Sequence, residues 1–445
     1  MLPILTPFNP TQYPGYQQPA FASYLPFALR TSTAGLPAPY VVATGLDFDV
    51  SSLKPAEGTV YYVIPSGGSD LYGGTNDTTD ALNTVNKAIQ LGNALGTGTY
   101  TVKVKTGTYD KTKGGMVTKP TLNCSIIGYG GPVYLQGADA SITWAQVADT
   151  TATYQATRSA VHNVFDTSLL TADGDWSRLT LNATYAAGEL DAGTYGIIGS
   201  VVYVRTADSR AVTNASVKVS ITAVLLQSDG AVTTYFEGLT CQGGYSTFGA
   251  TAGAARPTMY AKNCVFSYCG SAASPQNGIN IYATTVGLQG CTTFGNYLDG
   301  FNYHEKGVYT GNAFEVNCAG YRSGWSGSNA NNGSTIHAGC QIVRVNGVYH
   351  DTNGPIIADV GAGTNSWNVG CSAYGSTATT AEALASYFSQ CTGGAMWLDG
   401  CKADPAQTAS WDIAANIGGI VYTHNFISRG KIYIDTASGA KLIPY

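Results

Sequence analysis

Three short stretches of the chain share one pattern: KNCVFSYCG at residues 262–270, QGCTTFGNY at 289–297 and VNCAGYRSG at 316–324. In each stretch, Asn or Gly precedes a cysteine, and an aromatic residue follows within six positions. Cysteines preceded by a small residue or Asn stand at positions 241, 264, 291, 318, 371 and 401, and Gly347-Val348 occupies the one vacant step. Counted through residue 348, successive steps are 23, 27, 27, 30, 23 and 30 residues, which makes this an internal repeat.

A repeat of this length with short strands and no helices predicts a β-solenoid with one coil per repeat. Parallel strands of successive coils then lie about 4.8 Å apart, and equivalent residues stack. We expect the cysteines to form an internal column that serves packing, since a free Cys behaves as a small hydrophobic residue. The chain has 10 Cys and no CxxC pair, which disfavours a zinc site and leaves buried thiols as the expectation.

Composition narrows the class of protein further. The 445 residues include 55 Gly and 30 Tyr but only 22 Lys+Arg and 27 Asp+Glu, for a net charge of −5. Few charges and many aromatic residues exclude a disordered chain or a coiled coil, and the lack of a basic patch argues against nucleic acid as a partner. We predict no membrane span, because no stretch approaches about 18 apolar residues, and the residues indicate neither a metal nor a cofactor.

The chain divides into five expected segments. Residues 1–57 form an N-terminal arm, 58–141 a helix and the first solenoid coils, 142–222 an inserted β-rich module, 223–420 the solenoid, and 421–445 a closing segment. Strands are expected at 59–64, 100–105 and 200–205, and a helix at about 79–95 with its cap among Thr78, Thr79 and Asp80.

The stretch YYVIPSGGSDLYGGTNDTTDALNTVNKAIQ at 61–90, followed by TVKVKTGTY at 101–109, resembles the helix-capped start of right-handed parallel β-helix proteins of the pectate-lyase-like superfamily. Later stretches, LDGFNYHEKG at 298–307 and NGSTIHAG at 332–339, are similar to coils of bacteriophage tailspikes and related adhesins. The module stretch GTYGIIGSVVYVRTADSRA at 193–211 resembles β-sandwich insertions in such proteins. The resemblance therefore implies an all-β fold, a right-handed parallel β-helix with an N-terminal capping helix and an inserted β-sandwich-like module.

The same resemblance implies partners and a location. Tailspikes dock on a phage tail or baseplate protein through the N-terminal segment, form homotrimers and bind a bacterial surface polysaccharide. The N-terminus carries no Lys or Arg before Arg30, so no signal peptide is predicted, which fits a virion protein made in the host cytoplasm.

Candidate site residues gather between positions 299 and 359. Alignment of the coils on Gly278, Gly300, Gly333 and Gly354 places Ile281, Tyr303, Ile336 and Ile357 in one inward column. The same alternation directs three pairs of residues outward: Asn280 with Tyr282, Asn302 with His304, and Thr335 with His337. It also puts Asp359 in the column of Glu305, with Asp299 at the start of the same strand and Asp351 one coil further on.

A cluster of this many titratable groups is suited to the cleavage of a glycan. Hydrolysis needs two carboxylates, for which Asp299, Glu305, Asp351 and Asp359 are the candidates. Elimination at a uronic acid needs a base and stabilisation of negative charge, for which His304, His337 and Arg344 are the candidates. Asn302, Tyr282, Arg344 and Trp325 are the predicted substrate-binding residues. A structural ladder, a non-catalytic sugar site or a site shared between chains remains open for the same residues.

Two functions follow from these expectations. The first is a phage tailspike that binds and depolymerises a bacterial surface polysaccharide, either as a hydrolase or as a lyase. The alternative is a receptor-binding or structural spike on the same fold without enzymatic activity, which the absence of a diagnostic lyase signature favours.

Overall fold

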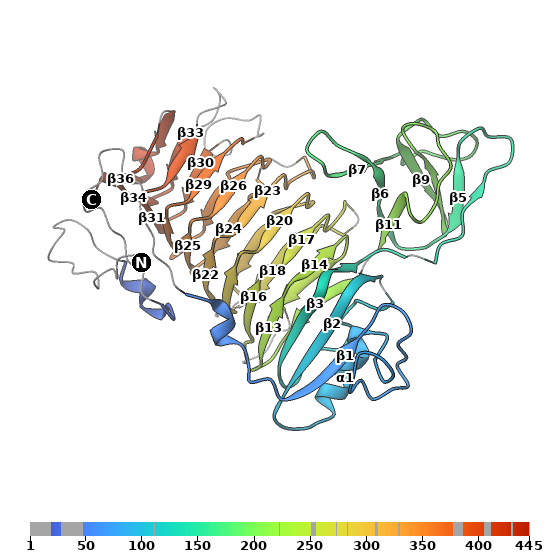
Figure 1. Ribbon diagram of the computed structural model, residues 1–445. Coiled ribbons are helices and arrows are strands. Elements are labelled where there is room, and N and C mark those ends of the chain that lie inside the picture. Colours follow the sequence, from blue (N-terminus) through green and yellow to red (C-terminus); the bar gives the residue numbers. More distant parts are fainter. Residues whose placement is uncertain are drawn as a thin grey trace, which may run out of the picture.

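The computed structural model describes residues 19–27 and 48–444, apart from positions 111, 140, 222, 251–254, 273, 283, 308–309, 328–329, 377–385, 405–410 and 429. Two large parallel sheets wind along one body, and smaller antiparallel sheets protrude from its N-terminal half (Figure 1). Each strand pairs in parallel with the equivalent strand of the next coil, as β16 pairs with β19 and β19 with β22. The predicted parallel β-solenoid is therefore confirmed in its strand pairing.

The solenoid has three faces, two of which belong to the 19-stranded sheet. The long strands β2 and β3 run through both of these faces, because β3 pairs with β13 and with β14. The first face contains β1 (Thr59–Val63), β2 (Thr99–Tyr109), β3 (Asn123–Gln136), β13 (Thr233–Glu237), β16 (Thr258–Lys262), β19 (Thr285–Gln289), β22 (Asn312–Val316), β25 (Gln341–Val345), β28 (Asn365–Val369), β31 (Ala395–Asp399), β34 (Ile420–His424) and β36 (Lys441–Pro444).

The second face continues each coil after a sharp bend, and the third face is the nine-stranded sheet. The second face contains β14 (Leu239–Gln242), β17 (Val265–Ser267), β20 (Thr292–Phe294), β23 (Ala319–Tyr321), β26 (Val348–His350), β29 (Ser372–Tyr374) and β32 (Lys402–Asp404). The third face contains β12 (Val224–Ser228), β15 (Tyr245–Phe248), β18 (Ile279–Tyr282), β21 (Phe301–His304), β24 (Ser334–His337), β27 (Ile357–Val360), β30 (Ser386–Cys391), β33 (Trp411–Asn416) and β35 (Lys431–Ile434).

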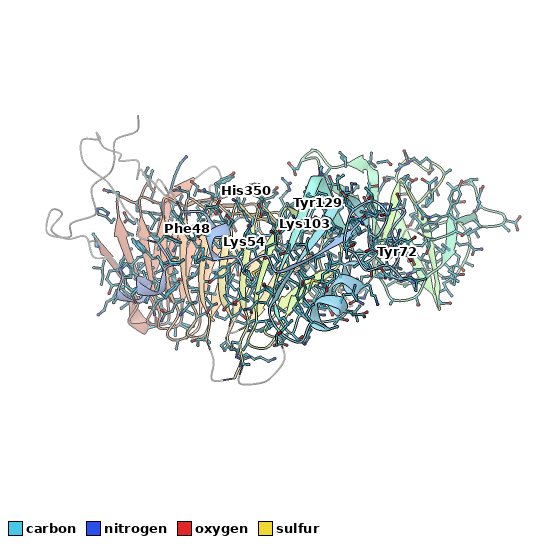
Figure 2. All side chains as sticks on the ribbon, turned by 60° about the horizontal axis from the view of Figure 1, so that its bottom comes forward. Phe48, Lys54, Tyr72, Lys103, Tyr129 and His350 are labelled. Carbon is cyan, nitrogen blue, oxygen red and sulfur yellow. The ribbon has the colours of Figure 1, made fainter. Side chains whose placement is uncertain are left out.

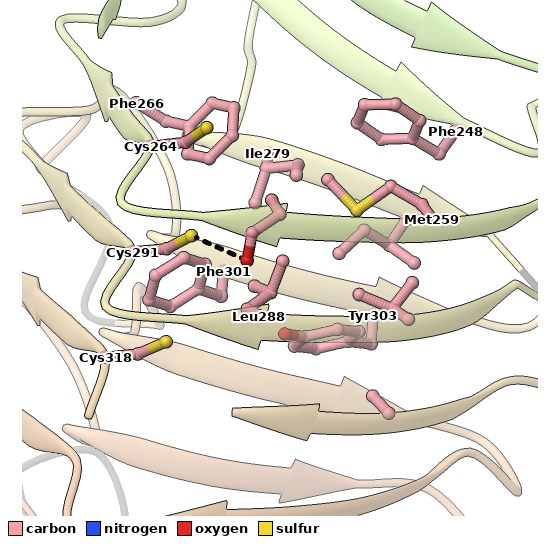
Figure 3. Packing of buried hydrophobic residues seen from close by; sticks show 14 of the residues in the cluster. Phe248, Met259, Cys264, Phe266, Ile279, Leu288, Cys291, Phe301, Tyr303 and Cys318 are labelled. Atoms are coloured by element: carbon pink, nitrogen blue, oxygen red, sulfur yellow. Dashed lines mark hydrogen bonds between the residues drawn. The ribbon is translucent and has the colours of Figure 1, made fainter. Parts of the chain in front are cut away.

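The bend between the first two faces explains the repeated Asn/Gly-Cys pattern. Asn263, Gly290 and Asn317 have φ values of 52°, 63° and 52°, a left-handed conformation that Asn and Gly tolerate best. The residue after each bend turns inward, so Cys264, Cys291 and Cys318 stack in the core (Figure 3). These thiols are fully or almost fully buried and contribute apolar packing along the solenoid axis.

The register corrects two members of the predicted cysteine column. Cys241 lies opposite Phe266, which is two residues further from the bend than Cys264. Leu239 therefore takes the position before Cys264 in the column. At the vacant step Gly347 follows the bend at Asn346, and the Tyr349 ring fills the space that a cysteine side chain would need there. Cysteine spacing alone cannot distinguish these neighbouring inward positions, because both are buried.

The helix that follows β1 has a different N-cap residue from those predicted. The helix α1 (Val85–Asn93) begins later than expected, and Thr84 is its N-cap, accepting a hydrogen bond from the Lys87 amide at 3.0 Å. Asp80 instead accepts hydrogen bonds from the amides of Gly73 and Thr75, which holds the preceding loop. The helix packs its buried residues against β1 and β2.

The N-terminal segment lies across the outside of the first face. The 3₁₀ turns η2 (Ala20–Tyr24) and η3 (Val50–Leu53) share an apolar cluster with Phe314 and Trp367, which point outward from their strands. The hydroxyl of Tyr24 donates to the Ala313 carbonyl at 2.5 Å, and the Val50 amide donates to Gln289 at 2.8 Å. Phe48, labelled in Figure 2, packs its ring against Phe314 at 5.7 Å.

The inserted module consists of two small sheets around a shared apolar cluster. It stands apart from the solenoid axis and contacts the solenoid through β6, β7 and the end of β11 (Figure 1). None of the helices in the described parts of the chain is long and apolar enough to cross a membrane. The module strands are β4 (Ala145–Gln146), β5 (Tyr154–Thr157), β6 (Val161–Leu170), β7 (Trp176–Arg178), β8 (Thr180–Leu181), β9 (Thr194–Ile198), β10 (Val201–Arg205) and β11 (Val217–Ile221), and a last 3₁₀ turn, η5 (Thr436–Ser438), precedes β36.

Candidate functional site

Three predicted site residues form one column on the outside of the third face. Tyr282, His304 and His337 come from β18, β21 and β24, whose register places Tyr282 opposite His304. The Tyr282 and His304 ring centroids are 5.7 Å apart, and those of His304 and His337 are 3.8 Å apart with an interplanar angle of 10°. We call these residues the histidine column.

Charged groups flank the histidine column at the end of β21. The Nδ1 atom of His304 lies 4.0 Å from a carboxylate oxygen of Glu305, and the Lys306 ammonium lies 5.4 Å from the Tyr282 ring centroid. The His304 and Glu305 side chains are 32% and 38% exposed, so both can reach a ligand. The column thus combines an imidazole, a carboxylate and an ammonium group at one surface.

Burial keeps both histidines of the column neutral at physiological pH. Desolvation lowers the pKa of His304, and Glu305 opposes this only in part. Desolvation and then the adjacent His304 lower the pKa of His337 to about 3. Neutral rings can stack closely without like-charge repulsion, and a neutral imidazole can accept a proton. The more exposed His304 is therefore the better base of the two.

Asp299 and Asn302 lie beside the column but are covered by the turn before β21. Asp299 accepts hydrogen bonds from the Asn332 amide at 2.8 Å and from the Asn302 side chain at 2.5 Å. Asp299 is 8% exposed and Asn302 is 2% exposed, although strand alternation directs Asn302 outward as predicted. Desolvation raises the pKa of Asp299 to about 7. The predicted direct contact of Asn302 with substrate is inconsistent with its burial.

The predicted surface position of Asp359 is wrong. The register pairs Ile336 with Asp359, two residues away from the alignment on Gly354, so Asp359 points into the solenoid. The reason is the turn at residues 353–355, where Gly354 packs on the backbone of Asn331 instead of Gly333. Asp359 is fully buried and cannot contact a polysaccharide.

Arg344 is likewise fully buried and is the partner of Asp359, at 3.6 Å between Nη1 and Oδ1. Its Nε donates to Ser334 at 2.8 Å, and Ser334 in turn donates to Glu315 at 2.8 Å. Desolvation raises the pKa of Glu315 and, to about 6, that of Asp359, while Arg344 opposes both shifts. The predicted role of Arg344 in binding substrate is therefore wrong, because Arg344, Asp359 and Glu315 form a charged network inside the core.

The second face carries a different row of rings on its outside, which the sequence reading did not identify as a site. Phe294, Tyr321, His350 and Tyr374 stack from coil to coil with centroid distances of 5.3, 4.8 and 4.6 Å and interplanar angles of 11° or less. We call them the aromatic row; His350 is labelled on the outer surface in Figure 2. Asp351 lies at its edge, where its carboxylate is 2.7 Å from His350 Nδ1. Asp351 therefore belongs to a different face from the histidine column.

The inserted module meets the solenoid beside the aromatic row. Trp176 stacks on Tyr268 at 4.7 Å and 8°, and Arg322 forms a two-pronged ion pair with Asp175 at 2.6 and 2.9 Å. Arg178 of the module lies over Trp325, with its Cζ atom 3.4 Å from the ring centroid. The predicted sugar-binding face of Trp325 is thus covered by a guanidinium group. The turn before Trp176 can be recognised from the sequence, but nothing in the sequence indicates which coil this turn contacts.

The strand pairing defines the chain as a parallel β-solenoid protein with an inserted β module. No protein family and no curated protein sequence matches it. Among solved structures, the chain is similar to a glycoside hydrolase (10% identity, 87% of this chain and 96% of that chain, TM-score 0.47) and to XylC in complex with xylose (12%, 83% and 70%, TM-score 0.45). It is also similar to the tailspike protein gp49 from Pseudomonas phage LKA1 (14%, 83% and 72%, TM-score 0.30). Because these TM-scores are below 0.5, the proposals below rest on the chain's own geometry.

Proposed function

We propose that this protein binds a bacterial surface polysaccharide along the outside of its solenoid, as a spike of a phage tail. The observation that carries the proposal is the aromatic row, which runs across four coils of a chain with few charged residues. Stacked rings present their edges outward, where phenol and imidazole groups can bond to sugar hydroxyls and ring C–H groups can contact the pyranose. A polysaccharide laid along the axis would meet one such edge in each coil.

The remaining features of a tailspike are part of the same proposal. We infer that the solenoid is right-handed, that α1 closes its N-terminal end, and that the inserted module is a β-sandwich. Further parts of the proposal are a homotrimer and attachment to a tail or baseplate protein through the N-terminal arm. Two described parts of that arm pack on the outside of the solenoid, and residues 1–18 and 28–47 of the arm lie outside the described residues.

Binding can be tested with purified protein and surface polysaccharides from candidate hosts. We expect saturable binding that Tyr321→Ala weakens about tenfold, since loss of an aromatic contact costs about 1 kcal/mol or more. Tyr203→Ala is the matched control, because Tyr203 contacts the Tyr185 ring within the module, away from the aromatic row. Equal loss in both variants, or no binding by the intact protein, would contradict the proposal.

A second candidate function is cleavage of a polysaccharide that lies on the third face, which the histidine column favours. A neutral His304 can accept the proton next to a uronate carboxylate, and the Lys306 ammonium can stabilise the charge that develops. The glycosidic oxygen then leaves with a proton, and an unsaturated sugar remains. Hydrolysis instead requires two carboxylates, of which only Glu305 is exposed at this column.

Product analysis separates these outcomes. Unsaturated, shortened chains would indicate a lyase, and His304→Ala should then abolish their formation while binding persists. Shortened chains without unsaturation would indicate a hydrolase and direct attention to Glu305 and Asp351. Binding without shortening would leave a receptor-binding spike and a structural histidine column.

A further inference from the structure

A cleft lies where the inserted module approaches the solenoid. It has a volume of about 300 Å³ and is lined on the module side by β6, β7, β8 and β9 and on the solenoid side by Ala272 and Trp325. Leu181 and Ile197 line this cleft and are 45% and 38% exposed. Exposed apolar side chains in a concave site with a few polar groups are typical of a place where a small molecule or a sugar unit binds.

Arg178 supplies the charge of this cleft. Its guanidinium Cζ atom lies 3.4 Å from the centroid of the Trp325 ring. The Tyr297 ring packs edge-on against Trp325, with the ring centroids 4.5 Å apart and an interplanar angle of 84°. Among the described residues, no carboxylate lies within ion-pair distance of Arg178, whereas Arg322 nearby is paired with Asp175. A guanidinium that lies over an indole can keep N–H groups available in its own plane, where they match the two oxygens of a carboxylate.

The surroundings of Arg178 favour a single negative charge as its partner. Desolvation lowers the pKa of Arg178 to about 10, and in the described part of the chain no carboxylate forms an ion pair with this exposed side chain. Solvent still reaches its side chain, so a ligand can do so too. Burial also lowers the pKa of His162, another residue of the cleft, which leaves Arg178 as the cleft's cation at neutral pH.

We propose that this cleft binds the carboxylate of an acidic sugar, with Arg178 forming a bidentate pair with it and Leu181 and Ile197 contacting the sugar ring. The inference rests on the proposed polysaccharide binding and specifies its substrate class: a polymer that contains uronate or another carboxylated sugar. The module then does more than decorate the solenoid, because it contributes the charged half of a site whose other half, Trp325, belongs to the coil after β23. Binding at the cleft and binding at the aromatic row can involve the same polymer.

Calorimetric titration with defined sugars tests this assignment. The probes are tetragalacturonate and a glucuronate oligomer, and the methyl ester of tetragalacturonate serves as the neutral matched ligand. We expect at least one acidic oligomer to bind the intact protein, and its methyl-esterified or reduced neutral form to bind at least about tenfold more weakly, the effect of losing one charge-assisted bidentate pair. Arg178→Gln should remove that preference, while Arg205→Gln, at a module arginine paired with Glu189, should retain it.

Several outcomes would overturn the assignment. They are equal affinity for acidic and neutral oligomers, unchanged affinity in Arg178→Gln, or no binding of either acidic oligomer. The comparison of acidic with neutral ligand uses the intact protein, so it remains decisive even if the Arg178 variant folds poorly. A host polysaccharide that binds equally well to the intact protein and to Arg178→Gln would overturn the cleft but leave polysaccharide binding standing. Failure of Tyr321→Ala to weaken that binding would overturn the role of the aromatic row but leave the cleft standing.

Discussion

Replacement of Asp299 by Asn should stabilise the folded protein, and the gain should grow with pH. The buried carboxyl has a pKa raised to about 7 by desolvation, whereas its ordinary value is 3.8. A carboxyl whose pKa is raised on folding contributes its full stability below the unfolded value and loses it as pH rises toward the folded value. Over this shift of about 3 pH units the folded state of the intact protein loses about 4 kcal/mol relative to the variant, at 1.36 kcal/mol per unit.

The hydrogen bonds of Asp299 allow this substitution. The new amide oxygen can accept from the Asn332 amide, as the carboxylate does at 2.8 Å. The new amide nitrogen faces Asn302, whose Oδ1 atom has no hydrogen-bond partner in the described structure. A flip of the Asn302 amide turns that oxygen toward the new donor, so one hydrogen bond between the two side chains is kept.

The assay is urea unfolding followed by tryptophan fluorescence for the intact protein and the Asp299→Asn variant between pH 4 and pH 8. The difference between their free energies of unfolding should increase by about 4 kcal/mol across this range. Asp191→Asn, at an exposed aspartate of the module, is the control and should follow the intact protein. A difference that stays constant from pH 4 to pH 8 would refute the reasoning, because it would show that burial does not raise the pKa of Asp299.

Three further predictions concern the core, the module and the thiols. Arg344→Met should destabilise the protein by about 3–5 kcal/mol at pH 8, since Glu315 and Asp359 would remain buried without their cation. The loss should be smaller near pH 4, where both carboxylates protonate. Equal losses in the free energy of unfolding by urea at the two pH values would count against the charged network. Arg322→Ala should release the turn before Trp176 and accelerate protease cleavage within residues 171–175. Arg158→Ala is the control. Unchanged cleavage would show that the Arg322–Asp175 ion pair does not hold the module. In the native protein a thiol reagent should modify Cys391 first, because the other nine cysteines are buried, and all ten should react after denaturation; rapid native reaction of several thiols would exclude the packed cysteine column.

The sequence predicted the coils well because each coil repeats one backbone requirement. A left-handed residue at the bend demands Asn or Gly, and the next inward position demands a small apolar residue, so Asn263-Cys264 and its equivalents are visible in the letters. The same logic placed Tyr282, His304 and His337 in one outward column, because β18, β21 and β24 have equal spacing from their leading glycines. Local rules of this kind survive without knowledge of the rest of the fold.

The errors arose where a loop length or a distant contact decides the outcome. Gly354 resembles the other leading glycines, but its turn is two residues longer on the strand side, so Asp359 lies within β27 opposite the inward Ile336, whereas Glu305 follows the end of β21. Glu315 and Arg344 are charged, which suggests exposure, yet they neutralise each other inside the solenoid. The pairing of Arg178 with Trp325 joins residues 147 positions apart, and no periodicity relates a module strand to a coil.

The N-terminal segment on the first face has a consequence for the order in which the molecule folds. Tyr24 reaches the carbonyl of Ala313, 289 residues further along the chain, and Phe27 contacts Phe314. During synthesis this contact surface does not exist until the coil of β22 has formed, so residues 20–27 are made well before their contact surface and are among the last to find their place. The segment consequently reports completion of the central coils, and a chain that stalls before residue 314 exposes two unsatisfied apolar surfaces that can bind a chaperone or another chain.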